Sequence, residues 1–187
     1  MVEWLVAIVV GVVQGLLEWL PVSSEGAVAL ALTLLDTDPE TATRFALFLH
    51  AGTALAATVY YRDVLADVLR TVPGWRPRRA FDGAYADLSF FAIATVVSGV
   101  VGISGYLALS AIASAAAGGV FVALIGALLL GTGLLMRAAD RRASALRTEP
   151  GLLDALLVGL LQGLAVLPGV SRSGTTVSAL LLRGPAG

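Results

Sequence analysis

Long apolar stretches constrain this chain more than any other feature of its sequence. Three of them, at about residues 44–61, 88–111 and 114–136, approach or exceed the roughly 20 residues that a helix needs to cross a bilayer. Only 13% of the residues are charged and the mean hydropathy is +0.90, whereas an ordinary soluble domain carries about 25% charged residues. The sequence therefore predicts an all-α integral membrane protein with three transmembrane helices within 44–136.

The composition also excludes several kinds of partner and site. The formal net charge is −1, so the chain has no overall basic character of the kind that binds nucleic acid. It contains no cysteine, which excludes disulfides and thiolate metal sites.

Met1-Val2-Glu3 carries no positive charge ahead of the first apolar stretch, so we interpret the N-terminus as mature structure. Residues 1–187 are predicted to form a single membrane domain.

Two further apolar stretches are interrupted. Residues 4–20 and 152–167 each end at a proline that is followed by serines and a glycine. The apolar character resumes at 27–35 and 175–182, in segments too short to span. Irregular backbone at membrane depth is tolerated where protein or a cavity surrounds it. We therefore predict two re-entrant helical hairpins, at 1–35 and 150–183.

The two hairpins resemble each other in sequence. The segment 10–16 (VGVVQGL) matches 158–164 (VGLLQGL) at five of seven positions. Leu20-Pro21 followed by Ser23 and Ser24 parallels Leu167-Pro168 followed by Ser171 and Ser173, with small gaps. Three predicted spans separate the hairpins, so the second must enter the bilayer from the opposite face. The sequence therefore predicts an inverted-topology repeat, whose broken helices typically meet near the midplane.

Arginine placement predicts the orientation of the chain. Five arginines lie in the connection 62–86 and four in 137–148, whereas the connection 36–43 carries Asp36, Asp38 and Glu40. The positive-inside rule assigns both arginine-bearing connections to the cytoplasm and the acidic one to the other side. Apolar residues on one helical face of 62–86 also favour a helix lying on the membrane surface, with a solvated loop as the alternative. These residues are Val64, Leu65, Val68, Leu69 and Val72.

Polar side chains inside the apolar stretches are candidate site residues. Gln14 and Glu18 are four residues apart and share one helical face. A carboxylate at membrane depth indicates a functional site, where Glu18 could hold a divalent cation or act as an acid or base. The alternative is an ion pair with Arg172 that has no chemical role. We expect Gln162 to support the second loop by hydrogen bonding, and His50 to be either a helix-interface residue or a site residue.

The two loops together predict an anion pocket. Ser23 and Ser24 precede one short helix, and Ser171, Arg172 and Ser173 precede the other. Serine hydroxyls cap helices, and the N-terminus of a helix attracts anions. Arginine adds a planar guanidinium that matches phosphate oxygens, and Thr175 and Thr176 extend the polar surface. Serines that serve only as caps are the alternative, which Arg172 disfavours because arginine at that depth needs an anion.

These motifs resemble a known family, the undecaprenyl-diphosphate phosphatases of the BacA/UppP type. The first motif runs from Gln14 through Glu18 to Leu-Pro-Val-Ser-Ser at 20–24, and the second is Pro168-Gly169-x-Ser171-Arg172-Ser173-x-x-Thr176. The resemblance covers essentially the whole chain. It implies hydrolysis of a polyprenyl diphosphate to the monophosphate, which recycles the lipid carrier for envelope glycan synthesis. It also implies a multi-pass protein of the cytoplasmic membrane with the active site toward the outer face, and a divalent cation, Mg²⁺ or Ca²⁺.

The resemblance also implies roles for individual residues. Ser24 would be the nucleophile, and Glu18, with Gln14, would hold the metal or position a proton. Arg172, the third catalytic candidate, would bind the diphosphate. The remaining candidates would bind substrate: Ser23, Gly26, His50, Gly169, Ser171, Ser173, Gly174 and Thr176. The implied partners are the polyprenyl diphosphate lipid and the bilayer. The formation of a homo-oligomer is left undecided.

Two departures from the family pattern affect these expectations. The family usually has histidine at the position of Ala27. An attacking serine needs a neighbouring base, so Glu18, Glu25, His50 or a metal-bound water would have to serve. Family members also continue with further spanning helices, so we expect the chain ending at Gly187 to be C-terminally incomplete. The alternative function is a transporter or flippase of a phosphorylated polyprenyl lipid, because broken helices in inverted repeats are a transporter architecture.

The orientation can be tested directly because the chain is free of cysteine. In intact cells, Asp38→Cys should react with a membrane-impermeant thiol reagent, and Arg142→Cys should react only after the membrane is opened. Reaction of both variants from the same side would contradict the predicted topology and the inverted repeat that depends on it.

Overall fold

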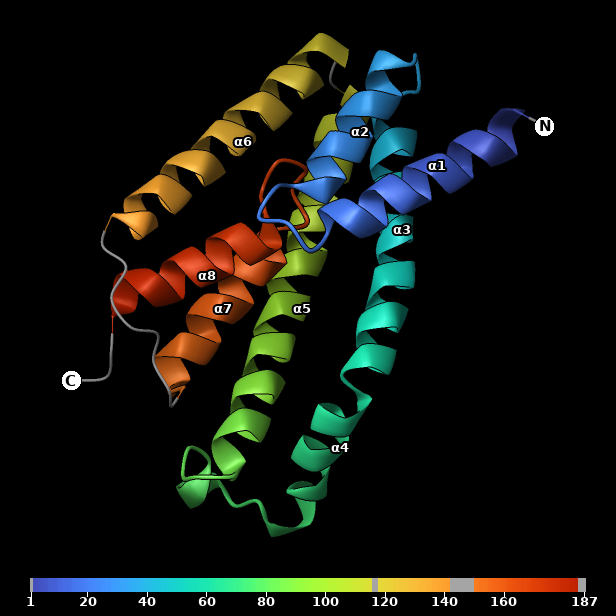
Figure 1. Ribbon diagram of the computed structural model, residues 1–187. Coiled ribbons are helices and arrows are strands. Elements are labelled where there is room, and N and C mark those ends of the chain that lie inside the picture. Colours follow the sequence, from blue (N-terminus) through green and yellow to red (C-terminus); the bar gives the residue numbers. More distant parts are fainter. Residues whose placement is uncertain (1, 116–117, 142–149, 185–187) are drawn as a thin grey trace.

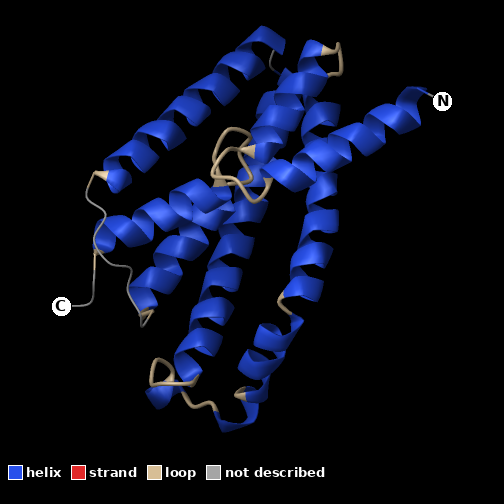
Figure 2. Ribbon diagram, in the orientation of Figure 1, coloured by secondary structure: helices blue, strands red, loops and turns tan. Residues whose placement is uncertain are grey.

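The computed structural model describes residues 2–115, 118–141 and 150–184, and every regular element in these ranges is helical (Figure 2). The prediction of an all-α protein is confirmed. The elements are α1 (Val2–Leu17), α2 (Ser24–Leu34), α3 (Pro39–Tyr60), α4 (Arg62–Arg70), the 3-10 turns η1 (Val72–Gly74) and η2 (Pro77–Arg79), α5 (Tyr85–Ala115), α6 (Gly118–Asp140), α7 (Leu152–Leu164) and α8 (Arg172–Arg183).

Three of the described helices are long and apolar enough to cross a membrane, over Pro39–Tyr60, Tyr85–Ala111 and Gly119–Asp140. The chain is therefore a multi-pass membrane protein, as predicted. Helix α3 begins earlier than the apolar stretch because Asp38 caps it, accepting a hydrogen bond from the Thr41 amide at 2.9 Å. Arg142 and Arg147, on which part of the orientation argument depends, lie outside the described residues.

The two interrupted stretches form two pairs of shorter helices. Helices α1 and α7 have 16 and 13 residues, which corresponds to about 24 and 20 Å, less than the roughly 30 Å of a hydrocarbon core. After α1 the chain turns back into α2, and after α7 it turns back into α8. The two turns lie side by side near the centre of the molecule (Figure 1). Entry of the two pairs from opposite membrane faces stays a prediction.

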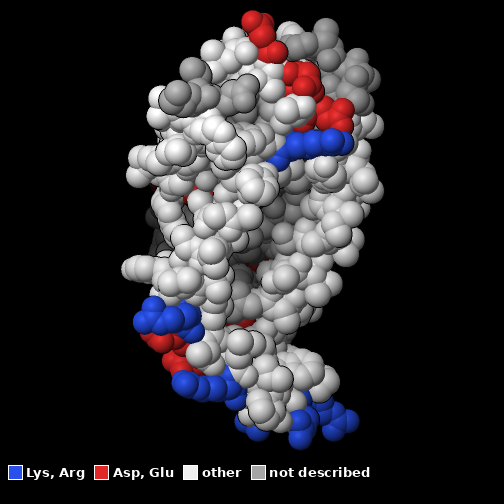
Figure 3. Space-filling model, turned by 90° about the vertical axis from the view of Figure 1, so that its right-hand side faces the viewer, with Lys and Arg blue, Asp and Glu red and all other residues white. Residues whose placement is uncertain are grey.

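Charged residues separate toward two ends of the molecule. The turn between α2 and α3 carries Asp36 and Asp38, and Figure 1 places it at the opposite end from α4 and the turns that follow. The face shown in Figure 3 has mainly acidic side chains at one end, and arginines together with some acidic side chains at the other. The arginines of α4 and of the turns that follow therefore lie at the end opposite the acidic turn, as the positive-inside prediction requires.

The predicted amphipathic helix is shorter than its apolar pattern. It covers only Arg62–Arg70, because Pro73 and Pro77 cannot continue an α-helix and two 3-10 turns follow instead. Val64 and Leu69 are more than half exposed, as expected of a helix whose apolar face meets lipid. The indole N–H of Trp75 donates to the Ser89 hydroxyl at 2.9 Å and joins this connection to the start of α5.

Helix α7 packs closely along α5 because two of its residues are glycines. A Cβ atom built on Gly159 would lie 2.8 Å from the Ala94 carbonyl oxygen, and one on Gly163 would lie 2.6 Å from Cβ of Val101. Small residues four apart allow such close approach of helix backbones in membranes. This contact holds the second hairpin against a long helix and so positions its loop.

Helix α2 is surrounded by three long helices. Its apolar residues pack in one cluster with α3, α5 and α6, and the cluster fixes the helix that begins at the first loop. The buried members are Val28, Ala29, Leu32, Ala42, Ala46, Leu109, Phe121 and Ile125.

Substitution of matched glycines tests the contact between α5 and α7. Gly163→Ala forces Val101 or the α5 backbone to move, and we expect it to destabilise the protein by about 1–3 kcal/mol. Gly15 occupies the matching place in the first hairpin and has open space around it. Gly15→Ala should therefore be neutral or stabilising by up to about 1 kcal/mol. Thermal unfolding in detergent, followed by circular dichroism, measures both, and equal effects would contradict the packing difference.

Candidate active site

The Ser23 hydroxyl connects the two loops. Ser23 is the N-cap of α2, and its Oγ accepts hydrogen bonds from the Gly26 amide at 3.1 Å and from the Gly169 amide of the second loop at 3.0 Å. Ser171 caps α8 in the same way, accepting from the Gly174 amide at 3.2 Å. The predicted caps are confirmed, and they bring the starts of α2 and α8 together.

Glycine is required where the loops touch. A Cβ atom on Gly26 would lie 2.7 Å from the Gly169 nitrogen. Gly169 has a φ of +107°, and its own Cβ would lie 2.7 Å from the Ile125 carbonyl oxygen, so a side chain is excluded both by conformation and by space. The Thr132 hydroxyl of α6 donates to the Gly169 carbonyl at 3.1 Å and fixes the second loop further.

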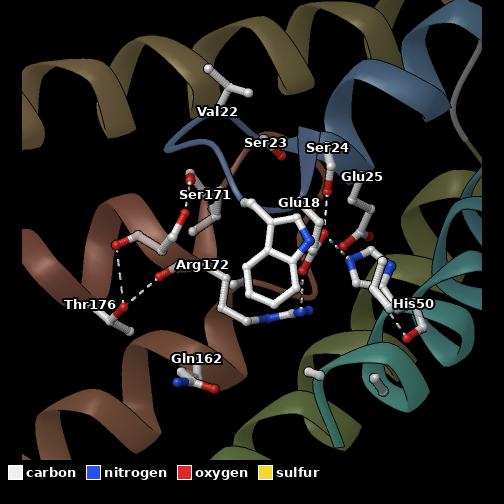
Figure 4. A pocket seen from close by; sticks show the side chains of 17 residues that line it. Glu18, Val22, Ser23, Ser24, Glu25, His50, Gln162, Ser171, Arg172 and Thr176 are labelled. Atoms are coloured by element: carbon white, nitrogen blue, oxygen red, sulfur yellow. Dashed lines mark hydrogen bonds and ion pairs between the residues drawn. The ribbon is translucent and has the colours of Figure 1, made fainter. Parts of the chain in front are cut away.

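A cavity of about 510 Å³ opens between these loops and helix α3 (Figure 4). Its polar wall contains two acidic residues, one histidine, one arginine and several hydroxyls. Those residues are Glu18, Ser23, Ser24, Glu25, His50, Thr53, Gln162, Ser171, Arg172, Ser173 and Thr176. Its apolar wall is formed by Trp19, Val22, Ala54, Ala57, Ala165 and Val170.

Glu18 is the centre of the polar wall. One carboxylate oxygen, Oε1, accepts from Nη1 of Arg172 at 3.0 Å. The other, Oε2, accepts from the Ser24 hydroxyl at 2.5 Å and from the Gln14 amide at 3.2 Å, and Nε2 of His50 lies 3.2 Å from it. Four side chains from α1, α2, α3 and α8 thus converge on one carboxylate, and the ion pair with Arg172 lies inside the cavity.

The contact between Ser24 and Glu18 has the geometry of an activated nucleophile. A short hydrogen bond from a hydroxyl to a carboxylate is charge-assisted, and a nucleophile within hydrogen-bond reach of a base is the arrangement that nucleophilic catalysis uses. Figure 4 shows Ser24 at the start of α2 with Glu18 directly below it. Serine therefore has its proton acceptor in place without a further residue.

Both ring nitrogens of His50 face acceptors. Nδ1 lies 2.9 Å from the Ala46 carbonyl oxygen, and Nε2 lies 3.2 Å from Oε2 of Glu18. A neutral imidazole has one N–H and can donate to only one of them, whereas an imidazolium can donate to both. Of the two interpretations of His50 from the sequence, the structure favours the site residue, which supports Glu18 from α3.

Comparison with known proteins identifies the family of this chain. The family described as bacitracin resistance protein BacA matches residues 7–186. The chain belongs to the BacA family. Its relatives include an undecaprenyl-diphosphatase of Haloarcula marismortui, 55% identical over 98% of this chain and 68% of the relative. Undecaprenyl-diphosphatases of Methanococcoides burtonii and Methanopyrus kandleri are 41% and 42% identical over 95% and 97% of this chain, and over 67% and 65% of their own lengths.

The predicted site residues occupy different places around the cavity. Ser23, Ser24, Glu18, His50, Ser171, Arg172, Ser173 and Thr176 line it. Gln14 is 1% exposed and lies behind Glu18, to which it donates. Gly26 and Gly169 form the contact between the loops, and the Gly174 amide donates to the Ser171 cap of α8; the cavity wall does not include these three glycines. The Gln162 side chain lines the cavity, and it has no hydrogen bond to any described residue, so the expected support of the loop is not found.

The described side chains alone do not fit a resident divalent cation. They contain no group of three or more His, Cys, Asp or Glu residues that could hold a metal. Glu18 and Gln14 were the predicted ligands, but both oxygens of Glu18 already accept from donors, and the Gln14 amide group is one of those donors. The metal stays a prediction, and no step of the reaction is derived through it.

Sequence reasoning gave little weight to two parts of this site. It treated Glu25 only as one of several possible bases, although the carboxyl-bearing side chain is 3% exposed and lines the cavity. It missed the apolar wall because alanines such as Ala54 and Ala57 are ordinary in an apolar helix. The available signal was position: Glu25 directly follows Ser24, and Ala54 and Ala57 lie one and two turns after His50.

Proposed function

We propose that this chain hydrolyses a polyprenyl diphosphate of the undecaprenyl type to the monophosphate and phosphate. The observation that carries the proposal is the 2.5 Å hydrogen bond from Ser24 to Glu18 in a cavity that Arg172 also lines. The names of the relatives, undecaprenyl-diphosphatase, describe the same reaction. Removal of phosphate recycles the lipid carrier for envelope glycan synthesis.

The diphosphate binds where the starts of α2 and α8 converge. Both helices present first-turn amides and the positive end of a helix dipole at the cavity, which is the arrangement that binds phosphate in many proteins. Arg172 adds a guanidinium that can contact two phosphate oxygens at once. The hydroxyls of Ser171, Ser173 and Thr176 line the same wall and supply further donors.

The reaction proceeds in two displacements at the terminal phosphorus. In the first, the Ser24 Oγ bonds to the terminal phosphorus and the bond from that phosphorus to the bridging oxygen breaks. The Ser24 proton passes to Glu18, and the bridging oxygen leaves with the polyprenyl monophosphate. In the second, water attacks the phosphoserine, the bond to Oγ breaks, and Oγ recovers a proton. Because phosphoryl transfer depends mostly on positioning and charge, the fixed Ser24–Glu18 contact is the central requirement.

Arg172 links substrate binding to this chemistry. Without substrate it is paired with Glu18 at 3.0 Å, and an arginine beside a carboxylate makes that carboxylate a weaker base. An arriving diphosphate offers more negative charge and draws the guanidinium toward itself. Glu18 then faces Ser24 with one cation fewer, so the base becomes stronger only when substrate is present.

The apolar wall receives the beginning of the prenyl chain. Trp19 and Val22 of the first loop are 58% and 47% exposed, and they continue the phosphate wall toward Ala54 and Ala57 of α3. A lipid diphosphate has its charged group and its first isoprene unit only a few bonds apart, so it needs adjoining polar and apolar walls. The cavity provides both, and inorganic diphosphate would use only the polar one.

The family and the charge distribution support a proposal for the cellular setting. We place the protein in the cytoplasmic membrane with the arginine-bearing connections on the inner side, and the cavity accessible from the outer face. A divalent cation, Mg²⁺ or Ca²⁺, would enter together with the diphosphate, because Mg²⁺ is commonly held by substrate phosphates and few carboxylates. A transporter or flippase of the same lipid would share the binding walls but would not need the Ser24–Glu18 contact.

Phosphate release by purified protein tests the reaction. We expect the wild-type protein to release phosphate from a polyprenyl diphosphate, and Ser24→Ala to abolish this release while still binding the lipid. Arg172→Lys should lower turnover by a factor of roughly 100 to 1,000, as loss of a transition-state contact worth about 2.7–4 kcal/mol does. Binding of the lipid without release by the wild-type protein would favour the transporter instead, and normal turnover of both variants would exclude this site.

The apolar wall is tested by filling it. Ala57→Phe should raise KM for a polyprenyl diphosphate about tenfold, equivalent to about 1.4 kcal/mol of binding, and leave kcat nearly unchanged because only chain binding is lost. KM for inorganic diphosphate, which would use only the polar wall, should change less. Ala56→Phe is the matched control, since Ala56 is exposed and lies outside the cavity wall. A KM effect of equal size for the polyprenyl diphosphate and for inorganic diphosphate would contradict binding of the prenyl chain at this wall.

A further inference from the structure

A second carboxyl group in the cavity has no hydrogen-bond partner among the described residues. Glu25 lies in the first turn of α2 next to Ser24, is 3% exposed, and lines the same cavity as Glu18. Both of its carboxyl oxygens are buried, and neither has a hydrogen bond within the described part of the chain. Figure 4 shows the side chain directed from α2 toward His50. Burial of an ionised carboxylate without a partner costs several kcal/mol, so proteins neutralise such groups or pair them.

The charged groups around the cavity form no ion pair with Glu25 within the described part of the chain. The charged and titratable groups that share its cavity are Glu18 from the end of α1, His50 from α3 and Arg172 from α8. Arg172 and His50 are both directed to Glu18, at 3.0 and 3.2 Å. An ionised Glu25 would add a second negative charge to a cavity that must admit a diphosphate, and like charges so close oppose each other.

A proton fits this position better than a cation. The Glu25 oxygens are buried from solvent, so a hydrated ion does not reach them in this conformation. A metal would also need several oxygen ligands, and the described residues provide no group of three or more His, Cys, Asp or Glu side chains. A proton needs neither space nor further ligands.

We propose that Glu25 is a neutral carboxylic acid at rest and is the proton donor and acceptor of the site, opposite Glu18. This inference rests on the proposed diphosphatase reaction. When Ser24 attacks and the bridging bond breaks, the bridging oxygen takes the proton of Glu25 and leaves on the monophosphate. Glu25 lines the cavity, but its two carboxyl oxygens are buried. Rotation of the side chain turns these oxygens into the cavity.

The second displacement restores the proton. Glu25, now a carboxylate, removes a proton from the water that attacks the phosphoserine, and the bond from phosphorus to Ser24 Oγ breaks. Oγ recovers from Glu18 the proton that it gave up in the first displacement. One carboxyl group therefore serves as acid and then as base, an exchange of roles that retaining glycosidases also use. The sum is one water consumed, with monophosphate and phosphate formed.

Infrared spectroscopy of the purified protein tests the protonation of Glu25 without any reaction. The wild-type protein at neutral pH should show the carbonyl stretch of a protonated carboxyl group, shifted by deuteration, and Glu25→Gln should lack it. Glu40→Gln is the control, because Glu40 lies outside the cavity and forms an ion pair with Arg44 at the start of α3; this variant should retain the band. A spectrum unchanged by Glu25→Gln would overturn the proposal.

Kinetics test the role of the proton. Glu25→Gln keeps the shape and neutrality of the acid, so KM for the polyprenyl diphosphate should stay close to that of the wild-type protein. Its kcat should fall about 100-fold or more, the effect of losing general acid–base help, and Glu25→Asp should recover part of it. If the Glu25→Gln variant has the same kcat as the wild-type protein, Glu25 only fills space as a neutral group and its catalytic role is overturned. Failure of the wild-type protein to release phosphate would instead refute the diphosphatase reaction, while the infrared result would still decide the protonation.

Discussion

The hydrogen bonds accepted by the Ser23 hydroxyl are the contact on which the rest of the structure depends. They join the amides of Gly26 and Gly169, so one side chain connects loops 146 residues apart in sequence. Two interrupted helices cannot leave backbone amides unpaired at membrane depth, and the first loop supplies the acceptor for one such amide of the second. The starts of α2 and α8 are consequently held together, which places Ser24 and Arg172 around one carboxylate.

The two hairpins share a sequence pattern but not a packing environment. Gly159 and Gly163 of α7 contact the backbone or Cβ atoms of α5 so closely that a methyl group would clash, whereas Gly15 of α1 has open space around it. Packing in membranes depends on what a small-residue face meets, and not on the glycines alone. The repeat therefore predicts similar loops and leaves the neighbours of each hairpin undetermined.

Much of the fold and part of the site could be predicted from the sequence. Apolar length gave the three spanning helices, and the Pro-Ser-Gly interruptions gave the two helix pairs and their caps. Glu18 and Arg172 were selected because charge at membrane depth is expensive, and the structure pairs them. The convergence of His50 on Glu18 and the isolation of Glu25 depend on how α2 and α3 pack, which no local pattern encodes. Helix α4 is shorter than the apolar periodicity predicted because Pro73 and Pro77 follow it, and the prediction gave these prolines too little weight.

Glu18 and Glu25 show how one cavity can give two identical functional groups opposite tasks. Glu18 is approached by an arginine, a histidine, a hydroxyl and an amide, so its charged form is stabilised and is available to accept a proton once the diphosphate draws Arg172 away. Glu25 faces the same space without any hydrogen bond to a described residue, so its neutral form is favoured and it is suited to give one. Two carboxyl groups whose environments separate their proton affinities are the usual signature of an acid and a base in one active site. Because Glu25 directly follows Ser24 on the first turn of α2, the loop contact that positions the nucleophile also positions the acid.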